Sequence, residues 1–256
     1  MTPPALFDLT GRTALVTGAS RGIGNTLARG LAAHGATVVL NGRRSDPRDA
    51  AVAAHRAHGH AAPGRVFDVT DAAAVDAAID DIEATIGPIG ILVNNAGIQQ
   101  RAPLHEFPRD GWARILDTNL TSVFLVGAAV ARRMIPRGAG KIINICSLTS
   151  ELGRRTIAPY AASKGGVKML TRGMCADWGP HNIQVNGLAP GYIVTEMNRA
   201  LMDDPDFDGW VRRRTPVGRW GETDELIGAA VFLSGPASDF VNGQVLVVDG
   251  GFSAVI

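Results

Sequence analysis

Residues 13–24 read TALVTGASRGIG, a short apolar run that passes through a glycine-rich turn into an amphipathic segment. The first four residues have the composition of a buried strand. Apolar residues then recur at helical spacing from Ile23 to Leu31, and Gly35 is placed to end the helix. The glycines allow a tight turn and let backbone N–H groups approach a phosphate at the N-terminus of that helix. The spacing differs from the common G-x-G-x-x-G pattern, and such a turn can also do no more than pack a helix on a sheet. Its place directly after the first strand favours phosphate binding.

The same alternation of short apolar runs and helical patterns continues along the chain. Six further runs, rich in Val and Ile and bounded by Gly, Asn or Asp, predict buried strands within residues 36–42, 64–70, 89–97, 140–147, 183–191 and 243–251. Between them lie amphipathic stretches such as the one that follows Asp71, a residue suited to the N-cap position. The alternation predicts an α/β fold of the Rossmann type, a doubly wound parallel seven-stranded sheet with helices on both faces. No repeat or linker interrupts it, so residues 1–256 are expected to form a single domain.

The composition argues against several classes of protein. Of the 256 residues, 46% are hydrophobic and 19% are charged, and the net charge of +1 argues against nucleic-acid or membrane-surface binding. Cys146 and Cys175 form neither a disulfide framework nor a metal-binding spacing, and Cys146 is expected in the core. No basic, apolar leader precedes the first strand and no uninterrupted apolar run would span a bilayer, so we expect a soluble cytoplasmic protein.

Three histidines, His55, His58 and His60, stand close together in the sequence. No fourth ligand or acidic neighbour completes a metal-binding set with them. We therefore expect no metal, and interpret the three side chains as a solvated helix end.

Residues 37–45 read TVVLNGRRS and close the second predicted strand with two arginines. A dinucleotide-binding fold usually has an acidic residue here, which binds the ribose hydroxyls of NAD. Positive charge in its place predicts that Arg43 binds the 2′-phosphate of NADP(H), with Arg21 of the glycine-rich turn facing the same spot. Asn41 is expected to assist, and Arg44 either assists or points into solvent.

A tyrosine and a lysine lie one turn apart within residues 157–179, which have a helical pattern. A free tyrosine has a pKa of about 10, too high for a general base near neutrality. The charge of Lys164, joined by a bound cationic nicotinamide, is expected to lower the pKa of Tyr160. Ser147, at the end of a predicted strand, can donate a hydrogen bond to an oxygen that gains or loses a proton. By spacing alone the pair is equally an exposed tyrosine beside a surface lysine.

Four motifs taken together resemble the short-chain dehydrogenase/reductase family over essentially the whole chain, and in that family's order: TGASRGIG (17–24), NNAG (94–97), Ser147 and YAASK (160–164). The resemblance implies a hydride-transferring oxidoreductase. It makes Tyr160 the acid/base, Lys164 its electrostatic partner and a ribose ligand, and Ser147 the residue that orients the substrate. It also implies that Asn119 holds a water for proton relay.

The resemblance also implies a set of cofactor contacts at the carboxyl ends of the strands. Asp68 corresponds to the acid at the adenine amino group, and Val69 supplies backbone beside it. The remaining cofactor residues carried over from the family are Gly18, Ser20, Gly22, Ile23 and Gly24 in the loop, Asn95, Ala96 and Gly97 beside the ribose, and Pro190, Gly191, Ile193 and Thr195 around the carboxamide.

Three further stretches resemble the gluconate-type sugar-acid dehydrogenases within this family: NAGIQQRAPL (95–104), NICSLTSELGRRTIAPY (144–160) and RTPVGRWGETDEL (214–226). The resemblance implies that gluconate and its 5-keto form are the reacting pair. A sugar acid needs a cation for its carboxylate, and Arg101 and Arg154 follow strands that open on one face. Either arginine is equally suited to a surface salt bridge, and the sequence does not decide which one holds the carboxylate. Polar partners are expected from Gln99, Gln100 and Glu151.

The polar segment at about 196–215 is expected to be irregular and, by the family resemblance, to form a lid over the substrate. The family also implies a homotetramer. Two alternatives remain: reduction of another carbonyl, such as a 3-oxoacyl thioester or a different polyol or ketose, and a non-catalytic NADP-sensing regulator. No basic surface for docking an acidic carrier protein is evident, which disfavours the thioester.

Overall fold

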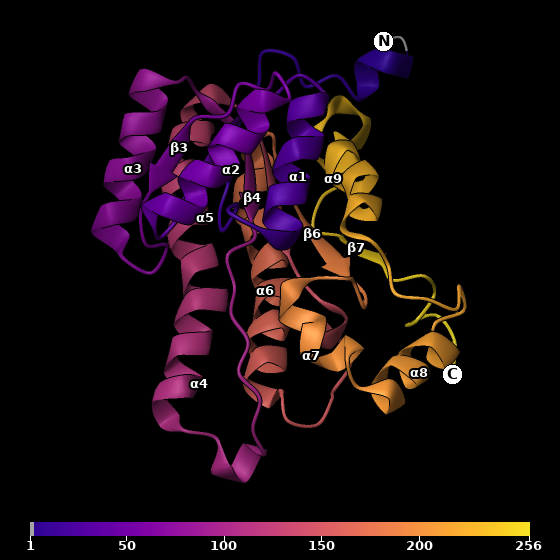
Figure 1. The fold of residues 1–256 in the computed structure, drawn as a ribbon. Coiled ribbons are helices and arrows are strands. Elements are labelled where there is room, and N and C mark those ends of the chain that lie inside the picture. The colour runs from indigo at the N-terminus through magenta and orange to yellow at the C-terminus, as the bar shows by residue number, and fades with distance from the viewer. Residues whose placement is uncertain (1–2) are drawn as a thin grey trace.

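The computed structural model describes residues 3–256 and has three layers, with one parallel sheet between two layers of helices (Figure 1). The strands are β1 (Thr13–Val16), β2 (Thr37–Gly42), β3 (Gly64–Val66), β4 (Ile89–Asn94), β5 (Gly140–Ile145), β6 (Ile183–Pro190) and β7 (Val245–Val248). They lie in the order β3-β2-β1-β4-β5-β6-β7, and every neighbouring pair is parallel. The predicted doubly wound, seven-stranded sheet in a single Rossmann-type domain is therefore confirmed.

Helices cover both faces of this sheet. The α-helices are α1 (Gly22–Ala33), α2 (Ser45–Ala57), α3 (Ala72–Thr85), α4 (Arg109–Leu116), α5 (Ser122–Met134), α6 (Ala158–Trp178), α7 (Arg199–Met202), α8 (Pro205–Arg214) and α9 (Ile227–Ser234). A π-helical turn, Asp117–Thr121, joins α4 to α5. Short 3-10 turns are formed by Pro3–Leu6, Leu104–Glu106, Ile135–Arg137, Leu148–Ser150, Gly179–His181, Glu196–Asn198, Thr223–Leu226 and Pro236–Ser238.

The core consists of two apolar clusters, one on each face of the sheet. Alternate residues of a strand point to opposite faces, so Ala14 and Val16 pack against α1, α2 and α9, whereas Leu15 packs against α3, α5 and α6. Every residue of β1 and of β6 is buried. This is why β1 reads as a nearly continuous apolar run rather than as an alternating pattern.

Local signals in the sequence account for the helix ends. Asp71 caps α3, its carboxylate accepting hydrogen bonds from the backbone N–H groups of Ala73 and Ala74. Helix α1 ends just before Gly35, whose φ of +99° favours glycine. Both predicted boundaries are confirmed.

The helical run Arg109–Arg137, which comprises α4, the π-helical turn, α5 and the following 3-10 turn, is the one stretch of residues 3–256 whose length and apolar composition would suit a membrane span. Half of its most apolar window is buried inside the protein. That burial is normal for the core helix of a layered domain. Helix α5 contributes buried residues to the cluster on the face of the sheet to which Leu15 points.

The segment predicted to be irregular at about 196–215 forms two helices, so that part of the prediction is wrong. Helix α8 begins with Asp204, whose side chain accepts from the backbone N–H groups of Asp206 and Phe207, and Pro205 occupies the first helical position. The Asp-Pro pair is a helix-start signal that could have been read from the sequence. Figure 1 shows α7 and α8 beyond the sheet, with α8 beside the C-terminus.

The interpretation of the three histidines as a solvated helix end is wrong for His55, whereas His58 is exposed at the end of α2. His55 is buried, with 3% of its surface exposed, and packs edge-to-face against His60. Neither ring nitrogen of His55 has a hydrogen-bond partner among the described residues. No group of three His, Cys, Asp or Glu side chains in residues 3–256 is arranged to hold a metal ion.

Candidate active site

The sheet order reverses between β1 and β4, because the chain runs outward to β2 and β3 before it returns to the other side of β1. In open α/β sheets a ligand crevice forms at this point, outside the carboxyl ends of the strands. Here a cavity of about 670 Å³ opens there, and a second cavity of about 130 Å³ adjoins it. Both are lined by Tyr160 and Thr195, so the two cavities form one cleft.

The glycine-rich turn lines the large cavity, and it packs so closely against the residues after β4 that only glycine fits at two of its positions. Gly18 has a φ of +61°, and a Cβ there would lie 2.9 Å from Cα of Ala96. A Cβ on Gly24 would collide with the side-chain amide of Asn95. That amide nitrogen donates to the carbonyls of Thr17 and Gly18 at 2.9 and 3.1 Å, and so it ties the turn to the end of β4.

The first turn of α1 is open to an anion. Arg21 occupies the N-cap position without a side-chain cap, and no acidic residue lies in the first turn. Gly22 lines the cavity, and the space where its side chain would be is open. Uncapped N–H groups at the positive end of a helix are suited to bind phosphate. The site therefore fits the pyrophosphate of a dinucleotide.

The residues at the adenosine end only partly match the prediction. Arg43, Arg44 and Val69 line the large cavity, but Asp68 lines neither cavity. The carboxylate of Asp68 accepts hydrogen bonds from the N–H and hydroxyl of Thr70, and its other oxygen lies 4.0 Å from Arg43.

Asn41 lines the cavity as expected, but its side chain is already committed. Its amide oxygen accepts from the N–H of Gly18 at 3.2 Å, and its amide nitrogen donates to the carbonyl of Phe67 at 3.0 Å. Asn41 therefore orders the glycine-rich turn, and its assistance at the 2′-phosphate stays a prediction.

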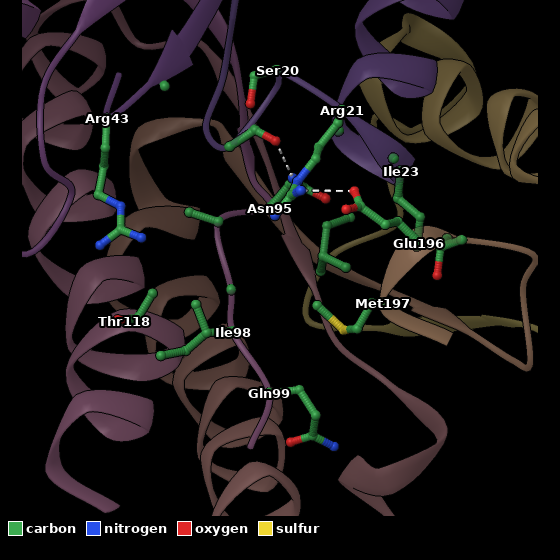
Figure 2. A pocket seen from close by; sticks show the side chains of 18 of the residues that line it. Ser20, Arg21, Ile23, Arg43, Asn95, Ile98, Gln99, Thr118, Glu196 and Met197 are labelled. Carbon is green, nitrogen blue, oxygen red and sulfur yellow. Dashed lines mark hydrogen bonds and ion pairs between the residues drawn. The ribbon is translucent and has the colours of Figure 1, made fainter. Parts of the chain in front are cut away.

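Arg21 does not face the same spot as Arg43. Figure 2 shows the two guanidinium groups on opposite sides of the cavity, with Arg21 directed toward Glu196 of the predicted lid. The Arg21 and Glu196 side chains form an ion pair of 2.7 Å, and both are more than two-thirds exposed. Arg21 must therefore leave Glu196 in order to reach a phosphate beside Arg43.

The three residues expected to act on the reacting oxygen lie together where the two cavities meet. Lys164 is buried, its Nζ donates to the carbonyl of Ile145 at 2.6 Å, and it lies 5.8 Å from the centre of the Tyr160 ring. Ser147, at the end of β5, faces the Tyr160 phenol from the smaller cavity. The alternative of an exposed tyrosine beside a surface lysine does not describe this pair.

Lys164 was expected to lower the pKa of Tyr160, but in the protein without cofactor that pKa is raised. Burial raises the pKa of Tyr160 above its usual 10, and the hydrogen-bonding hydroxyl of Ser147 opposes that rise. Burial also lowers the pKa of Lys164 to about 8. Desolvation disfavours the charged form of both groups, so a neutral phenol is the resting state near pH 7.

Asn119 lies in the π-helical turn and is fully buried. Its side-chain oxygen accepts from the N–H of Ile98 at 2.8 Å, and its nitrogen donates to the carbonyl of Ile98 and the hydroxyl of Ser163. The side chain lines neither cavity, and its hydrogen bonds order the loop after β4. The role of Asn119 in a proton relay stays a prediction.

Two arginines converge on the smaller cavity. Arg154 stacks on Phe207 of α8, with its guanidinium carbon 5.1 Å from the ring centre, and its buried Nε has no hydrogen-bond partner among the described residues. Arg101 donates only a long bond of 3.5 Å to the carbonyl of Met197. Burial and the neighbouring charge of Arg154 lower the pKa of Arg101. The two arginines repel each other, and Arg154 has an Nε hydrogen that still needs an acceptor. Both features favour an anionic ligand between them.

Of the expected polar partners, only Gln99 reaches the cleft. It lines both cavities, and its buried side-chain oxygen has no partner among the described residues. Gln100 accepts from Arg114, and Glu151 pairs with Lys168 on the surface, so neither lines a cavity. Both of these expectations are wrong.

Sequence reasoning missed Tyr192 and Thr149, which line the smaller cavity. Tyr192 packs edge-to-face against Phe207, Trp210, Trp220 and Phe252. Burial raises the pKa of its hydroxyl, and the adjacent Arg154 partly offsets that effect. A polar aromatic residue directly after a strand was the available signal for Tyr192. Of the predicted carboxamide residues, Pro190, Gly191 and Ile193 line this smaller cavity, and Thr195 lines both.

Comparison with known proteins gives consistent matches over nearly the full chain. A family model described as enoyl-(acyl carrier protein) reductase matches residues 18–253. A gluconate 5-dehydrogenase of Gluconobacter oxydans (strain 621H) is 60% identical over 253 residues, 99% of each chain. A 5-keto-D-gluconate 5-reductase of Escherichia coli (strain K12) is 54% identical over 251 residues, 98% of this chain and 99% of the relative.

A solved structure is equally similar. The crystal structure of a gluconate 5-dehydrogenase from Burkholderia cenocepacia J2315, in complex with NADP and tartrate, superposes with a TM-score of 0.97. It is 59% identical in sequence, and the match covers 99% of each chain.

Proposed function

The chain belongs to the short-chain dehydrogenase/reductase family, and from that premise we propose that it is an oxidoreductase that interconverts D-gluconate and 5-keto-D-gluconate with NADP(H) as its cofactor. The two curated relatives described above bear the names of the two directions of this reaction. The observation that carries the proposal is the placement of Arg101 and Arg154, which form no ion pair with an acidic side chain of residues 3–256, in the cavity that also contains Ser147 and Tyr160.

For the cofactor, the open N-terminus of α1 binds the pyrophosphate, and Arg43 binds the 2′-phosphate at the end of β2. Arg21 joins Arg43 once it has left Glu196. The solved relative that contains NADP supports this choice of cofactor. When bound, NADP(H) accepts or supplies the hydride.

The protein's own residues manage the proton and hold the substrate. In the reductive direction the Tyr160 phenol donates its proton to the oxygen formed from the ketone, and in the oxidative direction the phenolate takes it back. Ser147 donates a hydrogen bond to the same oxygen. The buried ammonium of Lys164 stabilises the phenolate when it forms.

The arginine pair holds the sugar-acid carboxylate. Arg154 is the principal ligand because its Nε is buried and lacks a partner, whereas Arg101 is more exposed. Tyr192 and Gln99 offer hydrogen bonds to the sugar hydroxyls. Helices α7 and α8, within residues 196–215, cover the substrate and exclude water.

We also propose that the protein is cytoplasmic and that it is a homotetramer, the latter as the family resemblance implies. Phe124 on α5 and Met169 on α6 are both more than half exposed, which supports an interface between these long helices. Sedimentation of the purified protein checks the subunit count.

A screen of NADPH oxidation tests the activity. The panel contains 5-keto-D-gluconate, 2-keto-D-gluconate, fructose and a 3-oxoacyl thioester, and 5-keto-D-gluconate is expected to have the highest kcat/KM. Preference for the thioester would replace the proposed substrate with one of the alternatives. Binding of NADPH with no turnover of any carbonyl would support the non-catalytic regulator.

A further inference from the structure

Ser147 is held in a short turn by reciprocal hydrogen bonds. Its Oγ accepts from the backbone N–H of Thr149 at 3.2 Å and from the Thr149 hydroxyl at 3.0 Å. Its own N–H donates to the hydroxyl of Ser150 at 3.2 Å, and that hydroxyl donates to the carbonyl of Lys164 at 2.9 Å. The turn therefore joins Ser147 to the helix that carries Tyr160 and Lys164.

The donor and acceptor capacity of Ser147 is then nearly used up. A serine hydroxyl has one hydrogen to donate and two lone pairs to accept with. Thr149 occupies both lone pairs of Ser147, one with its N–H and one with its hydroxyl. The single hydrogen of Ser147 is left to point toward the smaller cavity, where Tyr160 and the reacting oxygen lie.

We propose that Thr149 is a positioning residue that fixes the direction of the Ser147 hydroxyl hydrogen. This inference rests on the proposed acid/base chemistry at Tyr160. Before substrate binds, a Tyr160 phenolate can only accept, so Ser147 donates its single hydrogen to the phenolate. When substrate is bound, Ser147 donates that hydrogen to the reacting oxygen instead. In both states Thr149 must donate to Ser147. The side chain of Thr149 thus completes a directed chain from Thr149 through Ser147 to the phenol oxygen.

Loss of the Thr149 hydroxyl would leave one Ser147 lone pair empty and let its hydrogen rotate away from the phenol. Two effects follow. Hydride transfer slows because fewer molecules hold the Ser147 hydrogen toward the reacting oxygen. The phenolate also loses part of its stabilisation, and the base form of Tyr160 therefore appears at higher pH.

The test compares Thr149→Val, which keeps the shape but lacks the hydroxyl, with Thr149→Ser, which keeps the hydroxyl. The single-turnover rate of hydride transfer is measured in the reductive direction, and its pH dependence in the oxidative direction. We expect Thr149→Val to slow hydride transfer about 2- to 10-fold, the effect of one neutral hydrogen bond, and to move the alkaline rise of oxidation to higher pH. Thr149→Ser is expected to restore both, and NADPH affinity and melting temperature should match the wild type in both variants.

The inference would be overturned if Thr149→Val had the same rate of hydride transfer and the same pH profile as the wild type. Equal impairment of the two variants would also overturn it, because shape rather than the hydroxyl would then be responsible. The comparison uses whichever carbonyl of the screening panel the wild type reduces fastest. In this way the substrate assignment can fail while the role of Thr149 is still decided.

Discussion

Tyr160 and Lys164 lie one turn apart on α6, and burial disfavours the charged form of each side chain. Burial raises the pKa of the phenol and lowers the pKa of the Lys164 ammonium to about 8, so near pH 7 the phenol is neutral and the lysine still carries its charge. A general acid must be protonated before it can donate, and the neutral phenol meets that requirement near pH 7. The phenolate needed for oxidation must then be stabilised by groups close to its oxygen, among which Ser147 is the one that the structure identifies.

Replacement of the phenol tests this role. Tyr160→Phe keeps the ring and removes the hydroxyl, and we expect turnover of 5-keto-D-gluconate to fall about 100- to 10,000-fold, the usual contribution of a general acid. NADPH affinity should remain close to wild type, because the phosphate-binding residues lie elsewhere in the cleft. Steady-state kinetics and a fluorescence titration measure the two effects. A Phe variant that retains most of its turnover would remove Tyr160 from the mechanism.

The arginine pair offers a second test at this scale. Arg154→Ala is expected to lower kcat/KM for 5-keto-D-gluconate about 10- to 100-fold, and Arg101→Ala to lower it less, because the Nε of Arg154 is buried without a partner. Turnover of the neutral ketose fructose should change little in either variant. Arg155→Ala, which alters an exposed neighbour, is the matched control. Equal losses with the charged and the neutral substrate would argue that the arginines support folding rather than bind the carboxylate.

At the scale of elements, the glycine-rich turn and the predicted lid meet through Arg21 and Glu196 (Figure 2). An exposed ion pair is worth little, about 0–1 kcal/mol, but Arg21 must give it up to bind the 2′-phosphate. We therefore expect Glu196→Gln to tighten NADPH binding up to about fivefold and to leave NADH binding unchanged. Arg21→Ala, titrated alongside, should weaken NADPH selectively. Weaker NADPH binding in Glu196→Gln would mean that Glu196 helps to hold the cofactor.

Helix α2 contains a pH-sensitive position. Burial, together with the nearby charges of His60, Arg29 and His58, lowers the pKa of His55 below its usual 6.5. As pH falls below 6.5, the unfolded chain takes up the proton before the folded protein does, so the free energy of unfolding should decrease. This dependence should flatten in His55→Leu and persist in His105→Asn, which alters an exposed histidine. Denaturant unfolding at each pH measures it, and an unchanged slope in His55→Leu would assign the dependence to other groups.

Across the whole molecule, the sheet, its helices and the glycine-rich turn could be predicted because each rests on a local pattern. The burial of both sheet faces appears as continuous apolar runs, and Asp71 and Gly35 mark helix ends within a few residues. The orientation of Arg21 and the hydrogen bonds of the Asn119 side chain could not be predicted. Arg21 pairs with a residue 175 positions away, and Asn119 bonds to one 21 positions away. The burial of His55 likewise depends on packing that its polar neighbours in sequence conceal.

The proposed sugar-acid substrate is suggested by the similarity to gluconate dehydrogenases. The physical feature that supports it is a pair of arginines far apart in the sequence. Arg101 and Arg154 are separated by more than fifty residues in the chain, and only the fold brings them to one cavity. The aromatic cluster that holds Arg154 in place joins α8 to Tyr192 and to Phe252 near the C-terminus. The cation site is therefore a property of the assembled molecule rather than of any one motif.

The central claim, that this chain interconverts D-gluconate and 5-keto-D-gluconate with NADP(H), is tested most directly by identifying the product. The purified protein is incubated with NADPH and 5-keto-D-gluconate, and the sugar acid formed is identified by NMR and counted against the NADPH consumed. We predict one D-gluconate for each NADPH oxidised, with a much slower reaction when NADH replaces NADPH. Formation of L-idonate, the epimer at the reduced carbon, faster reaction with NADH, or no sugar-acid product would contradict the account.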